Sequence, residues 1–130
     1  MRRGPALAFA AAAASCAAML VIWWPGVAMY DSVDQYGQAL RGTYDDWHPP
    51  IMARLWSLLL FAKGGQAPMF VLQAAFYWLG LGLIAAALAR KGAPRAAAAL
   101  LALGALPLFA GWEAAVLKDA QMVAAMLAAT

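Results

Sequence analysis

Long apolar runs separated by short polar segments set the pattern of this chain. The first run, residues 6–24, carries no charge. A helix rises about 1.5 Å per residue, so a run of this length nearly crosses the roughly 30 Å hydrocarbon layer of a bilayer. Similar runs follow at 68–89 and 96–112, and a last one at 120–130 is too short to cross. The pattern predicts an all-α, polytopic membrane domain with about four transmembrane helices, the last one incomplete.

The polar segment 25–50 interrupts this pattern and predicts an external loop. The apolar run that follows, to residue 62, is too short to span a bilayer and contains Arg54. Pro49 and Pro50 suit the start of a helix. We therefore predict an amphipathic helix over 49–62 that lies in the membrane interface, with Arg54 reaching toward water. Pro107 predicts a kink in the span 96–112.

Composition and charge agree with a membrane protein and suggest its orientation. Hydrophobic residues make up 66% of the 130 residues and charged residues 12%, against roughly 25% charged in a globular chain. The loop 25–50 holds four aspartates and one arginine. Basic residues lie at the far ends of the first two long runs. Arg2 and Arg3 precede the first run, and Arg90, Lys91 and Arg95 follow the second. The positive-inside rule then places the N-terminus in the cytoplasm and residues 25–67 outside, which we expect to be across a bacterial inner membrane.

Three other conclusions follow from the sequence. A cleaved signal peptide is the alternative for residues 6–24, but the run is longer than a usual signal core, which favours an uncleaved anchor. The net charge of +3 is explained by the placement of basic loops, so we expect membrane lipids and no nucleic acid as partners. The one cysteine, Cys16, excludes an internal disulfide.

The first candidate site is the stretch YDSVDQYGQAL in the polar segment, where Asp31 lies six residues beyond Pro25. Asp31 and Asp34 share a face if this stretch is helical. A carboxylate beside an apolar surface can serve as a general base, with Asp34 as a second acid. The alternative is that both are solvated loop acids with a role in helix capping.

The second candidate is YDDWHPP, residues 44–50. Asp45, Asp46 and His48 lie within four positions, which suits a divalent metal. The alternative is a capped helix start in which His48 packs on an aromatic ring. No cofactor is certain from the sequence, because it contains no HExxH, CxxC, phosphate-loop or GxSxG pattern.

The third candidate is the pair Lys118 and Asp119 at the start of the last run. It is either a simple salt bridge or a site for an anionic lipid head group. Arg41 and Arg54 belong to the same predicted outer side and are further candidates for contacting a phosphate.

The order of these parts resembles the N-terminal region of the polytopic C-type glycosyltransferases, which include protein mannosyltransferases and lipid A aminoarabinose transferases. The matching residues are Asp31, Tyr36 and Ala39, then His-Pro-Pro at 48–50, the helix to Ala62 and the span ending at Arg90. The family often has a second acid where Ser32 stands here. The match covers nearly the whole chain as an ordered pattern of short motifs.

The resemblance implies an inverting transfer of a sugar from a polyprenyl-phosphate donor, with Asp31 as the base that deprotonates the acceptor. It also implies that His48 shapes the loop near the donor and that a cation such as Lys118, Arg41 or Arg54 holds the leaving phosphate.

Enzymes of this family have many more spans. We therefore expect the 130 residues to be the N-terminal part of a larger or split enzyme, inactive alone and completed by the missing part or a partner subunit. The alternatives are a small non-enzymatic membrane protein, either a subunit or a remnant, and part of a transporter.

Overall fold

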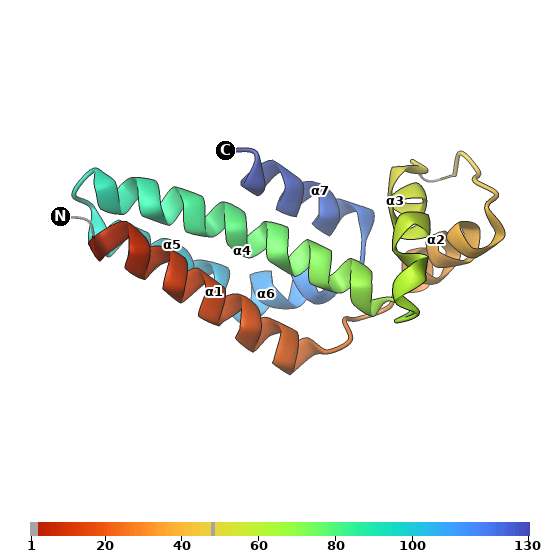
Figure 1. The fold of residues 1–130 in the computed structure, drawn as a ribbon, viewed down its shortest axis with the longest axis horizontal. Coiled ribbons are helices and arrows are strands. Elements are labelled where there is room, and N and C mark those ends of the chain that lie inside the picture. The colour runs from red at the N-terminus through yellow and green to blue at the C-terminus, as the bar shows by residue number, and fades with distance from the viewer. Residues whose placement is uncertain (1–2, 48) are drawn as a thin grey trace.

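The computed structural model describes residues 3–47 and 49–130, and His48 lies outside them. Within these ranges every regular element is a helix, and the helices form an elongated bundle (Figure 1). In chain order they are α1 (Arg3–Trp23), α2 (Tyr30–Arg41), α3 (Ile51–Leu59), the 3-10 turn η1 (Leu60–Ala62), α4 (Ala67–Arg90), α5 (Pro94–Gly104), α6 (Pro107–Ala114) and α7 (Lys118–Ala128). The predicted all-α class is therefore confirmed for the described residues.

Helix α4 is the centre of the bundle and packs against α1, α5 and α7 (Figure 1). Small residues allow the close approach. A Cβ atom added at Gly82 would lie 3.1 Å from the Cβ of Ala12 in α1, and one added at Gly80 would overlap the carbonyl carbon of Leu127 in α7. Small residues at helix contacts are typical of membrane bundles, because they let backbones pack closely.

Two helices, α1 and α4, are long and apolar enough to cross a membrane. Helices α5 and α6 form a third candidate, bent by 54°. The break lies just before Pro107, which has no N–H to continue the first helix and is well suited to begin the second. The predicted kink is thus confirmed. Many large apolar side chains point outward, among them Val21 and Leu108 at 81% and 76% exposed, as expected for surfaces that face lipid.

Residues 30–41, which we placed in the external loop 25–50, form helix α2. Its inward face is polar: Ser32, Gln35 and Gln38 are buried. Helix α2 packs on α3, and the two lie together at one end of the bundle (Figure 1). We call residues 30–62 the α2–α3 unit. Helix α3 with η1 forms most of the predicted helix 49–62, and α7 forms most of the predicted partial span 120–130.

The acidic residues gather toward one end of the bundle. The end with the N-terminus and the α4–α5 turn carries Arg3, Arg90, Lys91 and Arg95. All six acidic residues of the chain lie toward the opposite end, on the α2–α3 unit and around the connection between α6 and α7 (Figure 1). Four basic residues also lie toward this acidic end, so only the acids are confined to one end of the bundle: Arg41, Arg54, Lys63 and Lys118.

Candidate functional site

Two extended connectors meet at the acidic end of the bundle. The connector between α1 and α2 pairs with the one between α6 and α7, since the N–H of Val27 donates to the carbonyl of Ala114 (2.8 Å) and the N–H of Val116 donates to the carbonyl of Val27 (3.0 Å). Val116 is fully buried. The second connector is buried from the end of α6 to Leu117, just before α7 begins.

Ser32 joins helix α2 to this pair of connectors. Its hydroxyl accepts a hydrogen bond from the N–H of Met29 (3.0 Å) and donates one to the carbonyl of Val116 (2.6 Å). The first turn of α2, which contains Asp31, is thereby tied to a point two residues before Lys118, the first residue of α7. We call Val27, Asp31, Ser32, Val116 and Lys118 the α2–α7 junction. Two of the predicted site residues, the base and a phosphate-binding cation, belong to it.

Asp34 and Asp45 take part in local hydrogen bonds. The amide of Gln38 donates to Oδ2 of Asp34 (2.8 Å) and accepts from the N–H of Asp45 (3.3 Å). Oδ1 of Asp45 accepts from the N–H of Trp47 (3.2 Å), as in an Asx turn. These bonds fix the segment after α2 to the helix, and neither acid caps a helix start.

The described residues do not assemble the predicted metal site. Asp46 is exposed on the segment after α2. Over residues 3–47 and 49–130, no group of three or more His, Cys, Asp or Glu side chains is placed to hold a metal ion. His48, the third member of the predicted site, lies outside these ranges.

Two of the other predicted phosphate contacts, Arg41 and Arg54, belong to the α2–α3 unit. The guanidinium carbon of Arg54 is 5.4 Å from the centre of the Tyr44 ring, a cation–π contact within the α2–α3 unit. Arg41 is in the last turn of α2, beside Gly37. Asp119 is exposed in the first turn of α7, where its charge is favourable to the helix dipole.

Sequence reasoning missed a buried polar network. The side-chain amide of Gln73, fully buried in α4, donates to the carbonyls of Glu113 (2.6 Å) and Ala115 (2.9 Å). Gln121 of α7 donates to Oε1 of Gln73 (3.0 Å) and to the carbonyl of Met69 (3.3 Å). We call Gln73, Glu113 and Gln121 the inner network. Its one signal in the sequence is Gln73, a glutamine inside the otherwise apolar run 68–89.

A cleft of about 350 Å³ opens beside the first turns of α2, lined in part by Ser32, Tyr36, Trp56 and Gln66. The rings of Tyr36 and Trp56 have centroids 5.1 Å apart, and the indole N–H of Trp56 donates to the carbonyl of Gly65 (3.1 Å). The cleft thus combines aromatic walls with polar groups, and one of its lining residues, Ser32, follows Asp31 in the sequence.

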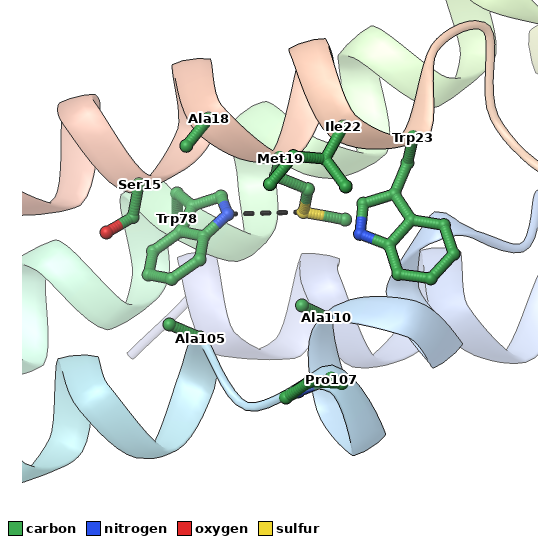
Figure 2. Close-up of a pocket in the computed structure, with 9 residues that line it drawn as sticks. All are labelled: Ser15, Ala18, Met19, Ile22, Trp23, Trp78, Ala105, Pro107 and Ala110. Atoms are coloured by element: carbon green, nitrogen blue, oxygen red, sulfur yellow. Dashed lines mark hydrogen bonds between the residues drawn. The ribbon is translucent and has the colours of Figure 1, made fainter.

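A second cleft of about 230 Å³ lies at the break between α5 and α6 (Figure 2). Met19 and Trp23 of α1 and Trp78 of α4 face Ala105 and Pro107 across it, and the indole N–H of Trp78 points to the sulfur of Met19 at 3.2 Å. Its lining is almost wholly apolar, so this cleft offers packing and no acid, base or cation.

Comparisons with protein families, curated proteins and solved structures find no match to the chain. The resemblance to C-type glycosyltransferases therefore depends on the sequence motifs alone, and the function has to be argued from the geometry of the site.

Proposed function

We propose that this chain is part of an integral membrane glycosyltransferase. In this proposal the enzyme transfers a sugar from a polyprenyl-phosphate donor to a hydroxyl acceptor on the outer side of a bacterial inner membrane. Asp31 is the general base, and Lys118 holds the phosphate that leaves.

The proposal includes a membrane topology. Helices α1, α4 and the bent pair α5–α6 span the bilayer, and α7 begins a fourth span. The N-terminus and the α4–α5 turn are cytoplasmic, which agrees with the basic residues at that end. Helix α3 lies in the outer interface. Ile51, Leu58 and Phe61 favour this position, since they are 71–80% exposed and would otherwise leave a large apolar surface in water.

The observation that carries the proposal is the hydrogen bond from Ser32 to the carbonyl of Val116. The resemblance implies a carboxylate base in the first outer loop and a cation for the donor phosphate. These two kinds of group are far apart in the sequence, and the bond joins the segments that bear them at the acidic end of the bundle. A donor whose prenyl chain lies in the bilayer would present its phosphate at this level.

The chemistry assigned to each group is that of an inverting displacement. The acceptor hydroxyl attacks the anomeric carbon, and its proton passes to the carboxylate of Asp31. A bond forms from the acceptor oxygen to the anomeric carbon while the bond from that carbon to the phosphate oxygen breaks. The polyprenyl phosphate leaves as an anion, and the ammonium of Lys118 stabilises the charge that develops on it.

The test is Asp31→Asn in the full-length protein. Membranes that contain it would be supplied with a panel of polyprenyl-phosphate-linked sugars, and release of free polyprenyl phosphate would be followed by mass spectrometry. We expect donor consumption to fall by about 10²-fold or more, which is the usual contribution of a general base. Insertion, measured as protein recovered in washed membranes, should not change.

Asp34→Asn is the matched comparison, because it removes a carboxylate one helical turn away that the structure engages with Gln38. A much smaller loss is expected for it. Unchanged donor consumption by Asp31→Asn would remove Asp31 from the mechanism, and absence of consumption by the wild-type protein would favour the non-enzymatic alternative.

A further inference from the structure

Glu113 forms part of the wall of a third cleft, between α4, α6 and α7. The cleft has a volume of about 480 Å³, within the range of small-molecule sites. Its lining residues are otherwise apolar or aromatic: Tyr77, Leu108, Phe109, Trp112 and Val123. The sequence analysis assigned no role to this glutamate, and the proposed glycosyl transfer does not use it.

One oxygen of the Glu113 carboxylate lacks a hydrogen-bond partner. The residue is 2% exposed, and its Oε2 has no hydrogen-bond partner. Burying a carboxylate is costly unless it is paired, and buried polar atoms in native proteins nearly always have partners. An ionisable side chain in such a position inside a membrane protein is therefore expected to bind something.

The walls restrict what that partner can be. The hydroxyl of Tyr77 already donates to the carbonyl of Gly104 (2.9 Å), so this residue offers its ring and not its proton. Tyr77, Phe109 and Trp112 supply aromatic surface, which attracts cations. Oε2 has no accessible surface in this structure, so the Glu113 side chain must turn toward the cleft to meet a ligand. A hydroxyl ligand would then give the carboxylate one hydrogen bond, whereas a primary ammonium group would give a hydrogen bond and a positive charge. The exposed side chain of Leu108 extends the apolar surface for the body of the ligand.

We propose that this cleft binds a primary ammonium group carried on an apolar body, with Glu113 as its counter-ion. The ligand is either a lipid with an amine head group or a free long-chain amine. Both sources present the same chemistry to the site: an N–H donor and a positive charge at Glu113, and hydrocarbon along the outer walls.

The test uses the full-length protein in phosphatidylcholine nanodiscs and a brominated dodecylamine, whose bromine quenches tryptophan fluorescence. Saturable quenching that is lost in Trp112→Phe reports occupancy of the cleft. We expect the amine to bind about tenfold more tightly than a brominated dodecanol of the same length, the size of effect expected for one hydrogen bond to a charged group. The nearly isosteric Glu113→Gln should remove this preference, whereas Asp46→Asn, which neutralises an exposed acid, should keep it.

Nanodiscs that also contain phosphatidylethanolamine distinguish the two sources. A weaker apparent affinity for the probe in these discs assigns the site to a lipid head group, and an unchanged affinity assigns it to a free amine. Equal affinities for amine and alcohol in the wild-type protein would overturn the proposal, whether or not Glu113→Gln folds. Absence of saturable quenching by either probe would also overturn it, and would leave a neighbouring protein helix as the partner of Glu113.

Discussion

The inner network and the α2–α3 unit are both polar regions of a largely apolar chain, but they use their polar groups differently. In the inner network, buried amides satisfy backbone carbonyls of a connector, as Gln73 does for Glu113 and Ala115. In the α2–α3 unit, side chains bond mostly within the unit, as Gln38 does with Asp34 and Asp45. The inner network therefore holds the bundle together, while the unit that carries the predicted chemistry depends on a few contacts for its position.

This comparison predicts which substitutions should reduce the stability of the protein most. Changes that separate α7 or the buried connector from α4 should cost the most stability. A change at the link between the two regions should cost less, and a change within the α2–α3 unit least of all.

The largest loss is expected from Gly80→Ala, because the added Cβ would overlap the backbone of Leu127, which cannot move aside as a flexible side chain would. We expect a cost of about 3 kcal/mol in the free energy of unfolding, measured by titrating mixed micelles with dodecyl sulfate and following circular dichroism.

Gly4→Ala is its matched control. A Cβ there would make an ordinary contact, 3.5 Å from the Cβ of Ala89, so the added methyl group overlaps nothing. Equal stabilities of the two variants would show that α7 does not pack against α4 at Gly80.

Gln73→Leu should come next, at about 2 kcal/mol, because it leaves the carbonyls of Glu113 and Ala115 without their donor inside the bundle. The same titration would measure it. Gln66→Leu is the control: this amide makes one bond, to the carbonyl of Gly26 (2.7 Å), and is only partly buried. A loss at Gln66 as large as that at Gln73 would contradict the special role of the inner network.

Ser32→Ala tests the link between the two regions. Loss of the bond to Val116 should cost about 1 kcal/mol, which corresponds to roughly fivefold faster hydrogen exchange of the amides in α2. Mass spectrometry of deuterated peptides would measure this. Ser57→Ala removes a hydroxyl that bonds only to the carbonyl of Arg54 in its own helix, so exchange in α2 should not change. If both variants leave α2 equally protected, Ser32 does not hold the unit in place.

The parts of the fold that the sequence predicted are those determined by local properties. Helices α1 and α4 follow from the length of their apolar runs, and the bend before Pro107 follows from a missing N–H. Helix α2 was missed as an element because its buried face is polar. Ser32, Gln35 and Gln38 point inward, whereas the usual amphipathic rule expects polar residues at the surface.

The sequence predicted individual residues of the candidate site but not how they are brought together. Asp31 and Lys118 were each identified as charged residues at the edges of apolar runs. The segments that carry them are joined by a hydrogen bond between residues 84 positions apart, which no local pattern contains. The inner network was unpredictable for the same reason, because the partners of Gln73 are backbone carbonyls 40 and 42 positions along the chain, and every residue type has such a carbonyl.

The smallest effect is expected at Arg54, and it separates two roles for this residue. Its guanidinium lies over the ring of Tyr44, an exposed cation–π contact that contributes about 0.5 kcal/mol. If Arg54 only anchors the segment after α2, then Arg54→Gln and Tyr44→Leu should each cost this amount, and the double variant should cost no more than either one. If Arg54 binds the donor phosphate, Arg54→Gln should also weaken donor affinity in the assay of polyprenyl phosphate release, whereas Tyr44→Leu should not. We expect the first result, because the contact with Tyr44 already engages the guanidinium at a distance of 5.4 Å, and this leaves the phosphate to Lys118.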